Sequence, residues 1–171
     1  MKKTLTTILA CSAITLLSAA PVIMPATASA SNVINGMSPN RFPSNAISIY
    51  VSPEFGTKEN NQINQAINIW NQTGMINLTP SANKSSQIVI KAGKKNLAKM
   101  TVNNNNNYIK QSVITLNPNN QKLAIAAKNE IGYSIGLNLK NSKHLKLSHH
   151  DITVLHHMYI ENSHQNQVVD N

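Results

Sequence analysis

The stretch KNEIGYSIGLNL, residues 128–139, carries the features that decide the fold of this chain. This stretch and the residues before it have apolar side chains at helical spacing, which predicts a helix between residues 119 and 137. Glu130 is expected on the broad face that also holds Leu123 and Ile131. Gly136 is expected to end the helix, because glycine readily adopts the positive φ found at helix ends.

The segments around this helix predict a mixture of strands and helices. An apolar stripe at i, i+3, i+4 and i+7 runs from Ile63 to Trp70, and it predicts a helix that ends near Gly74 with Trp70 in the core. Ser148, with Asp151 three residues later, predicts the start of the last helix. Short apolar runs predict strands at residues 46–51, 75–78, 87–92, 97–102 and 112–116. This order predicts an α+β fold, with a small mixed sheet and an N-terminal, a central and a C-terminal helix.

Residues 1–30 have the pattern of a secretory signal peptide. Basic residues at Lys2 and Lys3 precede an apolar run, and the segment ends with small residues at Ala28 and Ala30. A transmembrane anchor is the alternative, but threonines, serines and Pro21 interrupt the run before the ~20 apolar residues that a span requires. We therefore predict a secreted protein that keeps no membrane span after cleavage.

The composition limits the classes of partner. The formal net charge of +9 favours anionic surfaces, such as the polymers of a cell wall. Nucleic acid is not expected as a partner, because the lysines are scattered and few aromatic residues are available to stack on bases. The asparagine run from Asn103 to Asn107 is expected to form a loop.

Several segments resemble, in the same order, the catalytic domain of matrixins, which are zinc endopeptidases of the metzincin group. They are AINIWNQTGMINLTP (residues 66–80), SSQIVIKAG (85–93), NNYIKQSVITLNP (106–118) and LSHHDITVLHHMY (147–159). The chain is similar to small secreted matrixin-like proteins of Gram-positive bacteria. The resemblance implies a zincin-like, matrixin-type domain over residues 46–161. An extended lead-in (31–45) would precede this domain and a polar tail (162–171) would follow it.

The diagnostic matrixin segment, His-Glu-x-x-His-x-x-Gly-x-x-His, is matched only in part. Glu130 stands at the position of the general base, and Gly132 and Gly136 are in register with the segment. The loop KNSKHLK (residues 140–146) contains no methionine, although active matrixins carry a methionine turn in this region. The three zinc positions hold other residues: Asn129, Tyr133 and Leu139.

These replacements argue against zinc as a cofactor. The amide of Asn129 is a poor neutral ligand, the phenol of Tyr133 ionises only near a pKa of ~10, and Leu139 has no donor atom. Without zinc, Glu130 has no activated water to deprotonate. We therefore predict no cofactor, and a structural role for Glu130 through a bond to Tyr133 or pairing with Lys128 or a loop lysine.

The histidines offer few replacement ligands. His144, in the loop after the helix, is the one expected close enough for a weak metal contact. Histidines seven residues apart on the last helix are separated by ~10 Å, which is too far for two ligands of one ion. These pairs are His149 with His156 and His150 with His157. A solvated polar face is therefore expected for this helix.

The patterns together predict a secreted, catalytically inactive protein that binds an extended peptide or protein. A peptide can join the edge of a sheet through backbone hydrogen bonds, which need no metal. Either residues 97–102 or residues 112–116 are expected to provide that edge. Two alternatives stay open: an active extracellular zinc endopeptidase with substituted ligands, and a basic protein retained on a cell wall by anionic polymers.

Overall fold

A computed structural model describes residues 37–103, 105–138 and 142–161 of the chain. The predicted signal peptide (1–30), the first part of the lead-in and the predicted polar tail (162–171) lie outside these residues.

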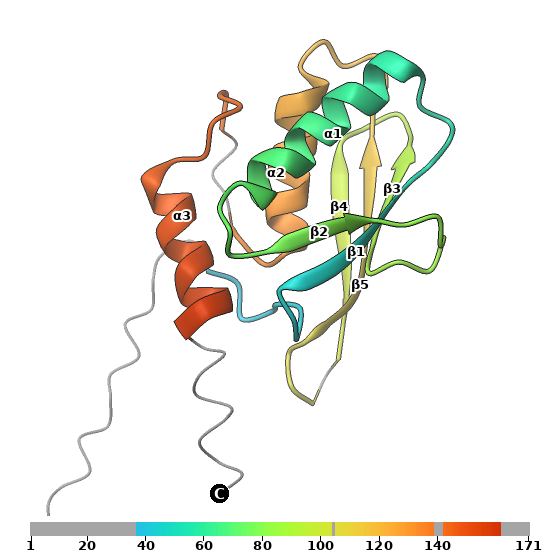
Figure 1. The fold of residues 1–171 in the computed structure, drawn as a ribbon. Helices are drawn as coiled ribbons and strands as arrows, with labels where there is room; N and C mark the ends of the chain where they lie inside the picture. The colour runs from blue at the N-terminus through green and yellow to red at the C-terminus, as the bar shows by residue number, and fades with distance from the viewer. Residues whose placement is uncertain (1–36, 104, 139–141, 162–171) are drawn as a thin grey trace, which may run out of the picture. The chain divides into compact units, whose positions relative to one another are not determined.

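A five-stranded sheet lies at the centre of the described residues (Figure 1). Its strands are β1 (Ala46–Val51), β2 (Asn77–Pro80), β3 (Ile88–Ala92), β4 (Leu97–Val102) and β5 (Ile109–Leu116). They lie in the order β2-β1-β3-β5-β4, and all neighbouring pairs are parallel except β4 with β5. Strands β2 and β4 are therefore the two edges of the sheet.

Three helices accompany the sheet: α1 (Thr57–Asn71), α2 (Leu123–Ser134) and α3 (His149–His156). A π-helical turn, η1 (His157–Glu161), continues α3. Helices α1 and α2 pack against each other on one side of the sheet (Figure 1). The predicted α+β class, with a small mixed sheet and an N-terminal, a central and a C-terminal helix, is confirmed. No helix within the described ranges is long and apolar enough to cross a membrane.

Some boundaries differ from the predictions. Strand β2 begins at Asn77 rather than at residue 75, because its parallel pairing with β1 starts where Asn77 lies opposite Ala46. Strand β5 begins earlier than predicted, at Ile109, because it also pairs with the end of β4. The central helix is shorter than predicted, because asparagine side chains hold the preceding segment in turns. Asn120 Oδ1, for example, accepts a hydrogen bond from the Lys122 N–H at 2.9 Å.

Alternating isoleucines and a helical stripe build the core. Strand residues such as Ile49, Ile90 and Ile114 are buried towards the helices, as a period of two requires. Trp70 on α1 is fully buried, and its Nε1–H donates to the Lys128 carbonyl at 3.0 Å. This bond joins α1 directly to α2.

The start of α3 and the end of η1 are held by specific polar contacts. The Ser148 Oγ accepts from the Asp151 N–H, and Asp151 Oδ2 accepts from the Ser148 N–H, so the predicted capping arrangement is confirmed. At the other end, the buried Tyr159 hydroxyl donates to the Ile135 carbonyl at 2.9 Å and accepts from the Phe42 N–H at 3.2 Å. Tyr159 therefore connects the last helical turn to the exit of α2 and to the lead-in.

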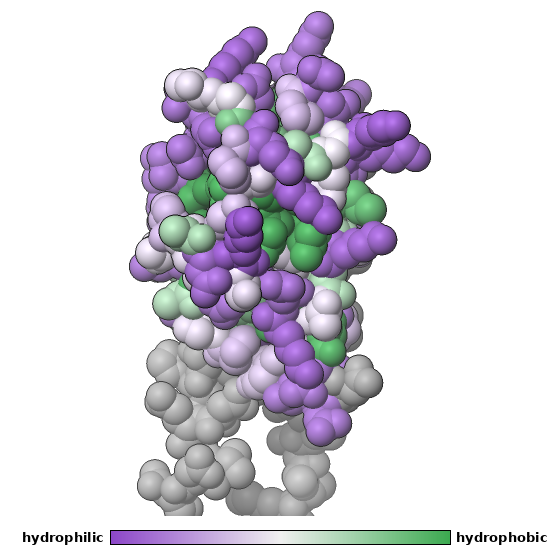
Figure 2. All heavy atoms as spheres, turned by 90° about the vertical axis from the view of Figure 1, so that its right-hand side faces the viewer, coloured by the Kyte–Doolittle hydropathy of each residue, from purple (hydrophilic) through white to green (hydrophobic). Residues whose placement is uncertain are grey.

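The opposite face of the sheet is not fully covered. Its side chains, which include Tyr50, Val89 and Val113, are partly exposed. Figure 2 shows one side of the molecule as mainly hydrophilic, with a smaller hydrophobic area near its centre. Burial is thus concentrated on the face that carries α1 and α2.

Candidate functional site

Two consecutive residues of α2 hold the loop that follows the helix. Asn129 Nδ2 donates to the Ser142 carbonyl at 3.0 Å, and Lys128 Nζ donates to the His144 carbonyl at 3.0 Å. Lys128 is fully buried. Burial lowers the pKa of the Lys128 ammonium, and the negative charge of Asp151 opposes this shift. The loop therefore packs on α2 through side-chain donors.

The burial of Lys128 differs from what the sequence pattern suggested. The face predicted for this helix included Glu130, but Glu130 is only partly buried, while Lys128 is fully buried. The spacing does contain a signal, because Lys128 lies at i+4 from Ala124 and at i−3 from Ile131, both of which are buried. A lysine in that stripe is usually expected to extend towards water. Here the His144 carbonyl provides an internal partner.

Glu130 faces the edge of the sheet. Burial raises the pKa of its carboxyl group, while a hydrogen bond from the backbone of Ala98 on β4 opposes the shift. No bond from Glu130 to Tyr133 or Lys128 is found among the described residues, so the partners predicted for this carboxylate are replaced by a strand backbone.

Tyr133 lies on the open side of α2 and is 45% exposed. It lines a hollow of about 210 Å³ together with Met37 and Pro39 of the lead-in, Met100 of β4 and Leu137. The hollow lies where the lead-in, the exit of α2 and the free edge of the sheet meet. Tyr133 therefore contributes an aromatic wall beside β4.

The two glycines of the quoted stretch shape the exit of α2. The Leu137 N–H donates to the Gly132 carbonyl at 3.0 Å and the Gly136 N–H donates to the Tyr133 carbonyl at 3.1 Å, which is a Schellman motif. Gly136 has a φ of +98°, and a Cβ there would clash with the Asn40 carbonyl oxygen. Gly136 thus permits both the turn and the close approach of the lead-in.

The side chains at the positions that the matrixin resemblance aligns with zinc ligands do not fit zinc. Asn129 uses its Nδ2 on the loop, and its buried Oδ1 has no hydrogen-bond partner among the described residues. The phenol of Tyr133 is a poor zinc ligand, and Leu139 lies outside the described residues. Within those residues, no group of three or more His, Cys, Asp or Glu side chains is placed to hold a metal ion. One amide oxygen and one phenol do not form the ligand set that zinc requires.

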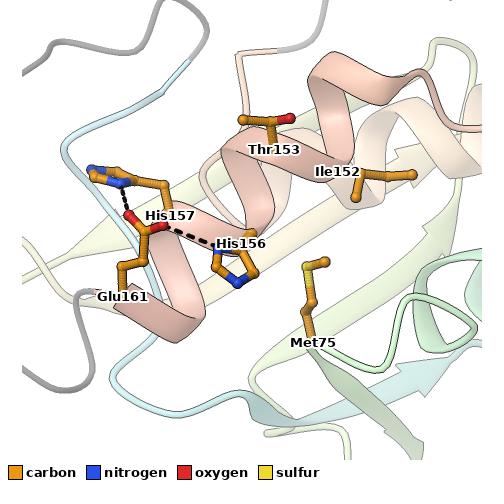
Figure 3. Close-up of a pocket in the computed structure, with 6 residues that line it drawn as sticks. All are labelled: Met75, Ile152, Thr153, His156, His157 and Glu161. Carbon is orange, nitrogen blue, oxygen red and sulfur yellow. Dashed lines mark hydrogen bonds and ion pairs between the residues drawn. The ribbon is translucent and has the colours of Figure 1, made fainter.

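The histidines lie away from this region or turn outward. His144 contributes its carbonyl to the Lys128 ammonium, while its side chain is exposed. Figure 3 shows His156 and His157 on either side of Glu161, with Nδ1–oxygen distances of 3.2 and 2.5 Å. These contacts, first with His157 and then with His156, lower the pKa of the Glu161 carboxyl. His149 and His150 are exposed, and His164 lies outside the described residues.

The His156, His157 and Glu161 side chains also border a second hollow. It has a volume of about 240 Å³ and is completed by Met75, Ile152 and Thr153 (Figure 3). The solvated polar face predicted for the last helix therefore includes, at its end, contacts of two histidine side chains with the exposed Glu161 carboxylate.

The chain is similar to the solved structure of a zinc protease. High choriolytic enzyme 1, a hatching-enzyme zinc protease from the medaka fish Oryzias latipes, matches with a TM-score of 0.44 and 16% sequence identity. The match covers 53% of this chain and 43% of the fish protein, which is less than half of its length. No protein-family model and no curated protein sequence matches the chain. The matrixin resemblance therefore stays a prediction from the sequence.

Replacing Glu130 by glutamine is expected to stabilise the protein at neutral pH. Burial raises the pKa of Glu130 above its usual value of 4.5 in the folded state. Ionisation of Glu130 therefore lowers the free energy of unfolding as the pH rises from 4.5 to the folded-state pKa. Glutamine cannot ionise and keeps an acceptor for the Ala98 N–H. We expect Glu130→Gln to raise the free energy of unfolding near pH 7 and to leave it unchanged near pH 3.

Urea denaturation at both pH values measures this difference. Glu59→Gln is the control, because a carboxylate in the first turn of α1 interacts favourably with the helix dipole. That variant is expected to lose a little stability near pH 7. A loss of stability in Glu130→Gln at pH 7 would instead assign the Glu130 charge a stabilising role.

Proposed function

We propose that this protein binds an extended peptide along the outer edge of β4 and does not hydrolyse it. The observation that carries the proposal is that Met100 of the edge strand β4 directs its N–H and C=O away from β5, beside the hollow lined by Tyr133 and Met100. In this proposal the fold is a metzincin-like one that has lost its metal, as the resemblance of the quoted segments implies. The predicted signal peptide would place the binding outside the cell.

The direction of the backbone groups supports an edge-binding role. The Ser112 N–H of β5 donates to the Gln87 carbonyl at 2.7 Å, towards β3. Its partner on β4, Met100, therefore belongs to a pair without mutual hydrogen bonds, and the N–H and C=O of Met100 point to the open edge. Ala98, two residues earlier, has the same orientation, in agreement with its bond to Glu130. Strand β5 is paired on both sides, so residues 97–102 provide the edge and residues 112–116 do not.

Side chains beside the edge provide apolar contact surface. Leu97 is 48% exposed at the start of β4, and Tyr133 is similarly exposed on α2. The hollow of about 210 Å³ between Met100, Tyr133 and Leu137 has room for one medium-sized apolar side chain. A peptide strand next to β4 would direct alternate side chains towards this hollow, which supports selection of an apolar residue.

A backbone substitution tests the proposal. Met100→Pro removes the outward N–H without removing a ladder bond to β5, and proline is tolerated at such edge positions. We expect Met100→Pro to fold and to lose peptide binding by about tenfold or more, since backbone hydrogen bonds give such complexes much of their affinity. Met100→Leu, which keeps the N–H and a similar volume, is the matched control and should bind normally. Retention on an immobilised library of unstructured peptides, followed by titration of the best binder, measures both variants.

Two results would contradict the proposal. If Met100→Pro folds and binds as tightly as the unchanged chain, the β4 edge is not the binding site. If the purified protein holds stoichiometric zinc and cleaves peptides, and Glu130→Ala abolishes the cleavage, the protein is an active endopeptidase with substituted ligands.

A further inference from the structure

Two loops meet at the end of the sheet to which the arrows of β3 and β5 point (Figure 1). Residues 93–96 connect β3 to β4, and residues 117–122 connect β5 to α2. The Gly93 N–H donates to the Leu116 carbonyl at 2.8 Å, and the Asn117 N–H donates to Asn96 Oδ1 at 2.8 Å. A Cβ on Gly93 would clash with the Thr115 side chain, so glycine permits this close approach. The two loops are therefore joined into one structure.

A hollow of about 630 Å³ lies between these loops. Its lining contains three exposed lysines and five carboxamide side chains, and no carboxylate. The lysines are Lys94, Lys95 and Lys122. The charge of the lining is therefore entirely positive.

Three asparagines beside the hollow use their Oδ1 atoms as acceptors for backbone N–H groups, so their Nδ2 groups remain as donors. Asn96 Oδ1 accepts from Asn117 N–H, Asn117 Oδ1 from Asn119 N–H at 3.0 Å, and Asn120 Oδ1 from Lys122 N–H. Since a backbone N–H requires an oxygen acceptor, these bonds fix the orientation of each amide group. The Nδ2 groups of Asn96, Asn117 and Asn120 make no hydrogen bond to the described residues, and they remain available as donors.

The start of α2 adds to this donor character. Lys122 is its N-cap residue, no side chain caps the first turn, and that turn holds no acidic residue. The first N–H groups of a helix carry partial positive charge, which favours an anion. One carboxylate does approach the adjoining strand, because Glu54 Oε2 accepts from the Ala92 N–H at 3.3 Å, but Glu54 does not line the hollow.

We propose that this hollow binds a linear polymer of phosphate diesters that carries no nucleobases, such as a polyol phosphate. Phosphate groups combine negative charge with several acceptor oxygens, which complements a site of ammonium and amide donors. The volume exceeds that needed for one phosphate, so successive phosphates of a chain have room. The lining holds no aromatic side chain on which a base would stack, which disfavours nucleic acid. This site is separate from the β4 edge and would hold the protein on a polyanion while that edge stays open.

A matched pair of triple variants of the full chain tests the proposal. The first replaces Lys94, Lys95 and Lys122 by glutamine, and the second makes the same change at the exposed lysines Lys84, Lys110 and Lys146. Both variants lose the same charge, so they differ only in where it is removed. The probe is a fluorescent glycerol-phosphate oligomer, titrated by anisotropy at low and at moderate salt. We expect the first triple variant to weaken binding by about tenfold or more and the second by far less, with affinity falling as salt rises.

The competing outcomes are distinct. Equal losses in both variants, or no binding of the oligomer at low salt, would overturn the proposal in favour of diffuse charge. Equal or tighter binding of a single-stranded oligonucleotide or of polyglutamate, matched in charge, would overturn it in favour of nucleic acid or acidic protein. The first triple variant is expected to keep its peptide binding, and Met100→Pro is expected to keep its binding of the oligomer. These two measurements make the test independent of the proposed peptide site.

Discussion

Gly136→Ala is expected to destabilise the protein strongly, by about 3–4 kcal/mol. Gly136 has a φ of +98°, which an L-residue with a Cβ rarely adopts. The new methyl group would also clash with the Asn40 carbonyl oxygen and lie 2.7 Å from Met158 Cε. The lead-in would have to move away from α2, although the Ser38 N–H donates to the Gly136 carbonyl at 2.9 Å. Urea denaturation followed by tryptophan fluorescence measures the loss.

Gly74→Ala separates the two causes of this loss. Gly74 also has a positive φ, +70°, but a Cβ there meets nothing within 4 Å. Only the backbone conformation is penalised, so about 1 kcal/mol is expected. Equal losses at the two positions would show that the contact between the lead-in and the exit of α2 is dispensable. The hollow beside Tyr133 would then have no fixed wall on that side.

Trp70→Ala is expected to cost about 3–5 kcal/mol, because it removes the largest buried side chain between α1 and α2. It also removes the indole N–H that donates to the Lys128 carbonyl at 3.0 Å. Since Lys128 and Asn129 hold the following loop, a shift of α2 should loosen the contacts to Ser142 and His144 as well. Far-UV circular dichroism during urea denaturation gives the free energy of unfolding.

Trp70→Phe is the matched control for this substitution. Phenylalanine keeps an aromatic ring in the core but cannot donate to Lys128, and about 1–2 kcal/mol of destabilisation is expected. The difference between the two variants measures packing apart from the hydrogen bond. A loss below about 1 kcal/mol in Trp70→Ala would contradict the burial of this side chain, since truncation of a buried large residue normally costs more.

Much of the local structure followed from neighbouring residues. The short apolar runs at residues 46–51 and 97–102 predicted β1 and β4 with the bounds that the structure has. Ser148 and Asp151 predicted the start of α3, because both partners of a capping arrangement lie within one helical turn. The predicted starts of β2 and β5 were wrong, because pairing with another strand decides that they begin at Asn77 and Ile109.

The sequence predicted which residues belong to the candidate site better than it predicted the contacts that they make. The resemblance to matrixins singled out Glu130, Asn129 and Tyr133 as candidate site residues. It did not indicate that Glu130 meets the Ala98 backbone, or that Lys128 is buried. Both contacts join residues far apart in the chain or on different elements, so no local spacing predicts them.

By itself the sequence determined the periodicities, the start of α3 and the glycine turn after α2, since each depends on one residue type or on residues within a turn. The tertiary structure alone decided that β4 is an edge strand, that Lys128 is buried and that the loops at Asn96 and Asn117 border a positive hollow. The physical reason is that strand order and loop proximity arise from long-range pairing. Such pairing is chosen by the burial of the whole core rather than by any single segment.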